Sequence, residues 1–131
     1  MSDYSAEKIQ GWAQLDDEPR FEAFLGLVVK HKEVWALSDD EGCLMVAMED
    51  ENCLPLWPLE IYAQQAVAEE WEGFSPLKIT LDNFYENWAP GMSGDEIAAA
   101  VFPNDEGSCT VLDSEELAVT LKLQAKKAPI A

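Results

Sequence analysis

Apolar residues with helical spacing mark the first long element of the chain. The segment Asp17-Glu18-Pro19-Arg20 places acidic residues and a proline where the first turn of a helix tolerates them best. Lys30-His31-Lys32 follows at the other end, where positive charge interacts favourably with the helix dipole. We therefore expect a helix over residues 17–32, after a shorter helical piece around Ile9–Ala13. The apolar stripe of the longer helix is Phe21, Phe24, Leu25 and Val28, at i, i+3, i+4 and i+7.

Beyond this helix the apolar pattern changes to short runs of strand length. Val34–Leu37 and Cys43–Met48 flank Asp39-Asp40-Glu41-Gly42, which predicts a β-hairpin with a glycine in the turn. Cys53–Trp57 is typical of a third strand. Because Pro55 has no amide hydrogen to donate, we expect this strand at the edge of a sheet.

The second half of the chain alternates predicted helices and strands. We expect a helix from Pro58 to Trp71, and a strand over Leu77–Leu81, where apolar and polar residues alternate. A short aromatic-rich helix follows, and Pro90-Gly91 should end it. The remaining predicted elements are a hairpin of Glu96–Phe102 with Cys109–Leu112, and a last helix in which Asp113 and Glu116 have capping-box spacing.

Together these elements predict an α+β fold in a single domain over residues 1–131. A chain of 131 residues can bury a sizeable core without a metal or a disulfide. Because predicted helices connect the middle strands, we expect one mixed sheet of about five strands with hairpins. Three to four helices would pack against that sheet.

The charge of the chain narrows the classes of partner. The formal net charge is −18, and between Glu33 and Leu121 the only basic residue is Lys78, against twenty Asp and Glu. Phosphate binding relies on Lys and Arg, so this distribution argues against nucleic acid and against an anionic membrane surface as partners. The acidic surface is either a solubilising coat or a surface for a basic partner. Crowded carboxylates also predict that added salt and mild acidification stabilise the fold.

Cysteine content and hydropathy indicate the compartment. Cys43, Cys53 and Cys109 are odd in number and lack paired spacing, which favours reduced thiols in a cytoplasm. The longest apolar stretch, Ile97–Phe102, has only the length of a strand, and the N-terminus lacks the pattern of a secretory signal. The sequence therefore predicts a cytoplasmic protein with no membrane segment.

Catalytic and cofactor motifs are absent from the sequence. His31 is the only histidine, and the cysteines are not spaced as zinc ligands, so we expect no metal site. No glycine-rich phosphate loop follows a strand and no Gly-x-Ser-x-Gly elbow is present, so we expect no cofactor and no catalytic residue. With twenty-six acidic residues, a chance carboxylate pair carries no information about acid–base catalysis. The expectation is a protein that is not an enzyme.

Two tryptophans stand out because each lies beside a proline. Trp57 is followed by Pro58, and Trp88 is followed two residues later by Pro90. Aromatic residues beside prolines can form rigid surfaces that anchor a partner, so these four are the candidate partner-binding residues. The alternative is a hydrophobic staple, in which Trp57 packs on a residue in the first turns of the helix that it introduces, such as Tyr62. We expect Trp57 to be largely packed, with one ring edge bordering a shallow apolar patch shared with Trp88.

Several of these motifs resemble an uncharacterised family of small acidic bacterial proteins, a domain of unknown function. The resemblance covers about residues 20–117, and its most specific parts are Leu54-Pro55-Leu56-Trp57-Pro58 and Trp88-Ala89-Pro90-Gly91. It implies a bacterial origin and a coherent domain, and no activity comes with it. The order of hairpin, proline-aromatic helix start and Val101-Phe102-Pro103 strand also looks like the domain of type III secretion enhancer proteins and some bacterial immunity proteins. That second likeness is architectural only; the blocks Arg20-Phe21-Glu22, Val34-Trp35 and Ile79-Thr80-Leu81 belong to the resemblance to the family of unknown function.

The sequence leaves three functional hypotheses. The first is a non-catalytic domain, a monomer or weak homodimer, that binds another protein of unknown identity; the acidic surface would suit a basic partner. The second is an acidic mimic of nucleic-acid charge that occupies a basic cleft of its partner. The third is a small-molecule-binding protein or an enzyme, which no motif supports.

Overall fold

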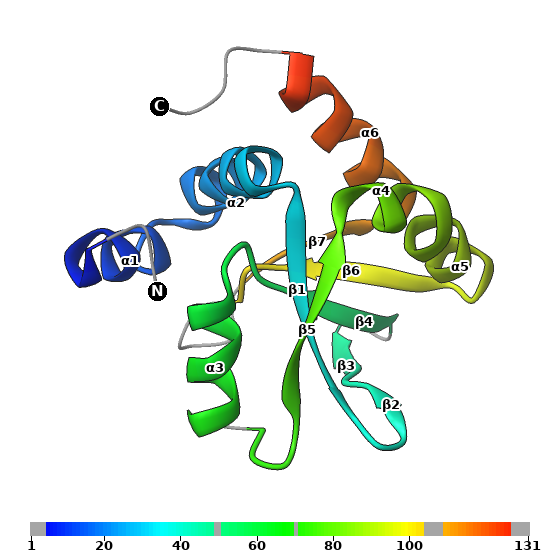
Figure 1. The fold of residues 1–131 in the computed structure, drawn as a ribbon. Coiled ribbons are helices and arrows are strands. Elements are labelled where there is room, and N and C mark those ends of the chain that lie inside the picture. The colour runs from blue at the N-terminus through cyan, green and yellow to red at the C-terminus, as the bar shows by residue number, and fades with distance from the viewer. Residues whose placement is uncertain (1–4, 49–50, 70, 104–108, 127–131) are drawn as a thin grey trace.

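Two β-sheets that meet at one short junction organise the chain, and helices cover them (Figure 1). The computed structural model describes residues 5–48, 51–69, 71–103 and 109–126. Helices and strands both contribute to one hydrophobic core. The predicted α+β class is therefore confirmed.

The first sheet has three strands in the order β2-β1-β5 and is antiparallel throughout. β1 (Glu33–Asp39) turns into β2 (Gly42–Cys43), so the predicted hairpin turn is present. The predicted second strand, Cys43–Met48, is wrong as one strand, because this segment is divided between β2 and a strand of the other sheet over Val46–Met48. Gly42 has a φ of 135°, a left-handed backbone that disfavours any other residue in this turn. β5 (Ser75–Thr80) pairs with β1 along its whole length.

The second sheet has four strands in the order β3-β4-β6-β7. β3 (Val46–Met48) pairs antiparallel with β4 (Glu51–Leu56), β4 pairs parallel with β6 (Ile97–Val101), and β6 pairs antiparallel with β7 (Thr110–Asp113). The mixed pairing was predicted. The single sheet of about five strands was wrong, because the described strands divide between two sheets.

The two sheets are joined at a pair of tryptophans. The Trp35 amide donates to the Trp57 carbonyl oxygen at 2.9 Å, and the Trp57 amide donates to the Trp35 carbonyl oxygen at 2.8 Å. Trp57 follows β4 directly, so the chain leaves the second sheet and pairs at once with β1 of the first.

The edge position predicted for the strand that holds Pro55 was wrong, since β4 lies between β3 and β6. Pro55 fits inside the sheet because successive residues of a strand direct their backbone N–H and C=O groups to opposite sides. The Leu56 carbonyl accepts from the Phe102 amide on the β6 side, so the nitrogen of the preceding Pro55 faces the other way. On that side Cys53 is paired with β3 and Trp57 with β1, and Pro55 lies between them, where no donor is needed.

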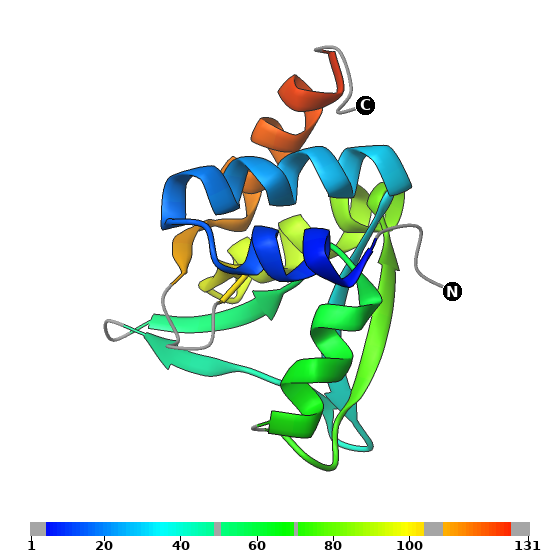
Figure 2. The same cartoon turned by 90° about the vertical axis from the view of Figure 1, so that its left-hand side faces the viewer.

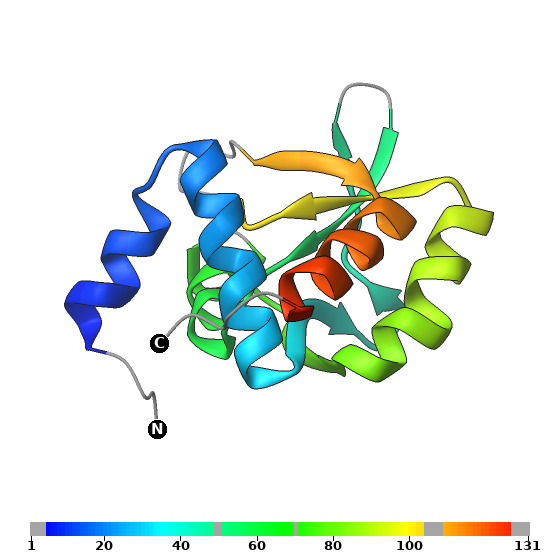
Figure 3. The ribbon, with the colours of Figure 1, turned by 90° about the horizontal axis from the view of Figure 1, so that it is seen from above.

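Helices cover both sheets (Figures 2 and 3). α2 (Asp17–His31) and α6 (Ser114–Lys126) lie over one face of the four-stranded sheet, and α1 (Ala6–Ala13) runs beside α2. α3 (Glu60–Glu69) packs against β1 and β5 of the other sheet. It begins two residues after Pro58, which was the predicted first residue.

The predicted end of the aromatic-rich helix at Pro90-Gly91 was wrong. α4 (Leu81–Asn83), the π-helix η1 (Phe84–Trp88) and α5 (Ala89–Gly94) follow one another without a break. In the π turn the Ala89 amide donates five residues back, to the Phe84 carbonyl. The chain therefore reaches Pro90 in the first turn of α5, where its missing amide hydrogen costs little.

The core lies between the four-stranded sheet and the two helices above it. α2 contributes Phe24 and Val28, and α6 contributes Leu117 and Leu121, and all four side chains are fully buried. The facing sheet residues lie at alternate positions along β4 and β6, because side chains at every second position of a strand share one face of the sheet. They are Leu54, Leu56, Ala99 and Val101.

Candidate functional site

Trp57 and Pro58 are buried. The Trp57 side chain retains 3% exposure, and its ring meets Trp71 edge-on with centroids 6.1 Å apart. Pro58 is buried beside it. The prediction that Trp57 is largely packed is confirmed. Its ring packs on Trp71, which lies after the end of α3, and not on a residue in the first turns of that helix as the staple hypothesis expected. Neither residue presents a surface to a partner.

Trp88 and Pro90 lie elsewhere in the molecule. Trp88 is half-buried in η1 and Pro90 is exposed on α5. Figures 1 and 3 place α3, which follows Trp57, and α5 at opposite sides of the molecule. The expectation of one apolar patch bordered by Trp57 and Trp88 was therefore wrong, because Trp57 has almost no surface and its ring packs on Trp71 instead.

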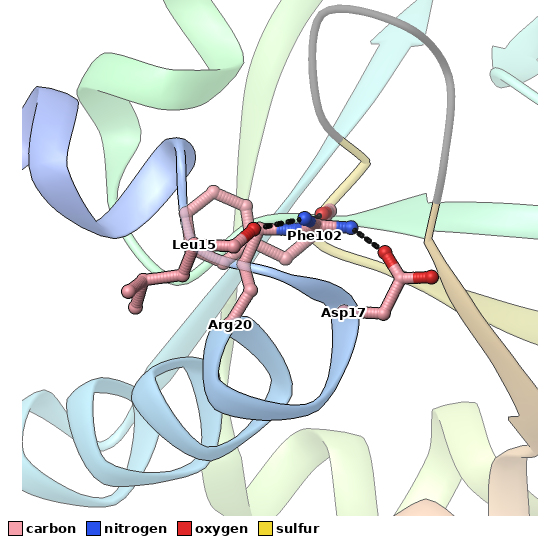
Figure 4. Close-up of polar contacts among 4 residues, drawn as sticks. All are labelled: Leu15, Asp17, Arg20 and Phe102. Atoms are coloured by element: carbon pink, nitrogen blue, oxygen red, sulfur yellow. Dashed lines mark hydrogen bonds and ion pairs between the residues drawn. The ribbon is translucent and has the colours of Figure 1, made fainter.

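A buried arginine joins the start of α2 to the end of β6 (Figure 4). Arg20 is 1% exposed, and its Nε donates to the Phe102 carbonyl oxygen at 2.8 Å. Its Nη1 donates to the Leu15 carbonyl oxygen at 2.7 Å, and its Nη2 pairs with Asp17 Oδ1 at 2.6 Å. A buried guanidinium needs such partners, because an unpaired charge in the interior is costly.

The arginine also fixes an unusual backbone. Phe102 has a φ of 52°, in the left-handed region that a bulky side chain disfavours. Its carbonyl accepts from Arg20, its amide donates to the Leu56 carbonyl at 2.7 Å, and its ring lies 4.6 Å from that of Tyr62. These contacts hold the chain where it leaves β6. The role of this cluster is structural.

Sequence reasoning missed Arg20, although a signal was present. Arg20 precedes Phe24 by four residues and Leu27 by seven, so helical periodicity places it on the buried face of α2. A basic residue at a core position, three residues after Asp17, indicates a buried ion pair.

An open cleft of about 660 Å³ lies where β4 and β6 begin and β7 ends. Its apolar part is formed by Ile97, Ala98, Val111 and Leu112. Its acidic part is formed by Glu51, Asp95, Glu96 and Asp113, with Asn52 and Ser93 beside them. In Figure 3 this is the end of the four-stranded sheet next to α5.

Strand register brings the cleft carboxylates together from distant parts of the sequence. Asn52 is paired with Ile97 and Ala98 with Asp113, so the residues next to these pairs gather at one end of the sheet. The turn after α5 is held by the Asp95 and Glu96 amides, which donate to the Gly91 and Ser93 carbonyls at 3.0 and 3.2 Å. Asp113 Oδ1 accepts from the Glu115 amide at 2.7 Å and so also caps α6.

The chemistry that this arrangement supports is the binding of positive charge. A cleft lined by four carboxylates and by apolar residues suits an ammonium or guanidinium group on an aliphatic stem. No cluster of three or more His, Cys, Asp or Glu suited to a metal ion occurs within the residues that the structure describes.

The thiols of Cys43 and Cys109 are poor nucleophiles. Burial, with a further contribution from nearby Cys53, raises the pKa of Cys109 to about 11, against the opposite effect of Arg20. Burial also raises the pKa of the Cys43 thiol. A thiolate is the reactive form of cysteine, so both groups are protonated and unreactive near neutral pH.

In the described parts of the chain, none of the helices combines the length and the apolar character that crossing a bilayer requires.

The comparison with protein families identifies the chain. Residues 21–121 match the family described as "Protein of unknown function (DUF2750)", which is most of the chain, so the protein belongs to that family. The predicted membership of a family of unknown function is confirmed, with a match close to the residues 20–117 expected from the motifs. The search of curated proteins found no match.

Proposed function

We propose that the protein is a non-catalytic binding domain that takes a basic segment of another protein in the acidic cleft. One observation carries the proposal: Glu51, Asp95 and Glu96 line one cleft together with apolar residues at the end of the four-stranded sheet. A lysine or arginine side chain can place its aliphatic stem against the apolar residues and its charge near the carboxylates.

The charge of the whole molecule supports the same partner. A net charge of −18 attracts basic proteins over distances of about the Debye length and raises their rate of association. Affinity of this kind decreases as the salt concentration rises. We place the interaction in the bacterial cytoplasm, the setting that reduced cysteines favour.

A mimic of nucleic-acid charge is the second candidate. Its support is the single basic residue, Lys78, between Glu33 and Leu121. The partner would then be a nucleic-acid-binding protein, and duplex DNA would compete with this protein for it. If the partner binds only the acidic cleft, adding duplex DNA should not dissociate the complex.

A peptide titration tests the proposal. The probe is a seven-residue extended peptide of alternating Lys and Val, and binding is followed by chemical-shift changes of backbone amides. We expect shifts at Ala98 and Val111, and weaker binding by the triple variant Glu51→Gln, Asp95→Asn, Glu96→Gln. Asp113 is left in place because it caps α6.

The matched control removes the same number of charges elsewhere. Glu22→Gln, Asp40→Asn, Glu41→Gln neutralises three exposed carboxylates on α2 and in the β1–β2 turn. We expect this variant to retain most of the affinity of the unmodified protein. Equal losses in both triple variants would mean that net charge, and not the cleft, determines binding, and the proposal would be wrong. If only the cleft variant loses affinity, affinity capture with the same pair of variants would identify the natural partner.

A further inference from the structure

The outer face of α6 carries an exposed apolar stripe. Among the described residues the exposed large hydrophobic side chains are Met45, Val119 and Leu123, and two of these three lie on this helix. Val119 is 56% exposed and Leu123 is 55% exposed. They lie one turn apart, on the side opposite the buried Leu117 and Leu121.

Charged residues of opposite sign extend the stripe at its two ends. Glu116 precedes Val119 by three residues, and Lys126 follows Leu123 by three, and both are exposed. The resulting spacing of three, four and three residues is that of a coiled-coil seam. Along the helix axis the stripe is therefore acidic, apolar, apolar and basic.

The remaining lysine of this helix is directed elsewhere. Lys122 Nζ lies 4.9 Å from the centre of the Tyr85 ring of the same chain. Figures 1 and 2 show α6 at the outside of the molecule, with no other helix or strand above it. The stripe is thus open to a second molecule.

We propose that two copies of this chain associate through α6, packed antiparallel about a two-fold axis. In this arrangement Val119 packs on the partner's Leu123, and Glu116 pairs with the partner's Lys126. Two-fold symmetry repeats both contacts, because an isologous interface uses the same patch of each copy. This inference does not rest on the proposed function, since it uses a different face.

Charge complementarity selects the antiparallel orientation. A parallel, in-register pair would oppose Glu116 to Glu116 and Lys126 to Lys126, which is unfavourable. The antiparallel pair matches each acid with a base and keeps the apolar residues in the middle. A shallow hollow of about 400 Å³, lined by Glu115, Glu116, Val119 and Thr120, lies where the partner's Leu123 would enter.

The size of the surface predicts a weak dimer. A helix of 13 residues is about 20 Å long, so this contact falls well below the area of a standard protein interface. We expect a dissociation constant of roughly 0.05–1 mM at moderate salt. Because each copy carries a net charge of −18, lowering the salt concentration should weaken association.

Charge-swap variants test the pairing, with sedimentation equilibrium at 0.02–1 mM protein as the measurement. We expect Glu116→Lys and Lys126→Glu each to weaken the dimer about tenfold, and the double variant Glu116→Lys, Lys126→Glu to restore it. If the overall negative charge of the two copies, and not the pairing of Glu116 with Lys126, limited the dimer, Glu116→Lys would tighten it, because this change makes the net charge less negative. The matched control Glu86→Lys, at an exposed position of η1, should not weaken it.

A second variant tests the apolar contact. Leu123→Asp should leave the chain monomeric at 1 mM and leave its urea midpoint nearly unchanged, because the side chain is already exposed. The proposal is overturned if the unmodified protein is monomeric at 1 mM, if both single charge reversals leave the dimer unaltered, or if the double variant stays as weak as the singles.

Discussion

Arg20 Nε and the Phe102 carbonyl oxygen, 82 positions apart in the sequence, are 2.8 Å apart in the structure. This hydrogen bond connects the beginning of α2 to the left-handed residue that ends β6. It explains why a chain with so few basic residues places one of them in its interior. The arginine satisfies carbonyl groups that would otherwise be buried without a donor.

Replacing Arg20 should therefore destabilise the fold strongly. Arg20→Met keeps much of the side-chain volume but leaves the Phe102 and Leu15 carbonyls without their donor. We expect a loss of about 2–4 kcal/mol in the free energy of unfolding, measured by urea denaturation. Asp17→Asn is the control and should cost less than about 1 kcal/mol, since the Asp17 side chain is 52% exposed. Equal costs for the two variants would contradict the role given to the buried guanidinium.

Trp57 should behave as a core residue. Trp57→Ala removes a ring that is 3% exposed and leaves a cavity beside Trp71, so we expect a loss of about 3–5 kcal/mol. Trp57→Phe keeps most of the packing and should cost less. Because the acidic cleft lies at the other end of β4, Trp57→Phe should bind the Lys-Val peptide as the unmodified protein does. A changed peptide affinity in this variant would restore Trp57 as a binding residue.

The Cys109 thiol predicts a loss of stability at alkaline pH. Its pKa is raised from 9.0 to about 11 by burial first and by Cys53 second, so the folded state holds the proton more tightly than the unfolded state. The corresponding stability is present below pH 9.0 and is lost as the pH rises toward 11. Urea midpoints at pH 8, 9.5 and 10.5 should fall less steeply for Cys109→Ala than for the unmodified protein. Parallel slopes would show that the thiol contributes nothing to this pH dependence.

Salt should stabilise the protein against urea. The net charge of −18 makes the compact state repel itself, and salt screens that repulsion. We expect a higher urea midpoint in 0.5 M NaCl than in 0.02 M NaCl, and a smaller difference for Glu22→Gln, Asp40→Asn, Glu41→Gln. A midpoint that falls with salt would mean that ion pairs such as Lys78 with Glu33 outweigh the repulsion.

Local patterns in the sequence predicted the individual elements well. α2 and the β1–β2 hairpin follow from apolar spacing and from a turn glycine, which depend on residues close together in the chain. The two-sheet arrangement depends instead on the pairing of Trp35 with Trp57, which no local pattern shows. Two prolines misled the prediction. Pro55 lies in β4 between the residue paired with β3 and the residue paired with β1, where no amide donor is needed, and Pro90 follows a π turn that lets the helix continue.

The candidate site was beyond the reach of sequence reasoning for the same reason. Glu51, Glu96 and Asp113 lie in three segments that only the register of β4, β6 and β7 brings together. The proline-flanked tryptophans attracted attention because their setting is unusual locally, but packing explains Trp57. The excess of acidic residues was visible in the sequence, but the cleft in which four of them lie beside apolar residues was not.

The pair of hydrogen bonds between Trp35 and Trp57 has a consequence for how the molecule opens. Trp57, which directly follows β4 of one sheet, pairs with Trp35 in β1 of the other, so the two sheets cannot separate without breaking this pair. The amides of Trp35 and Trp57 should therefore exchange with solvent deuterium only through global unfolding, at one common rate, while the outer strands exchange earlier. In this respect the two sheets are a single cooperative unit, although their strand ladders are separate.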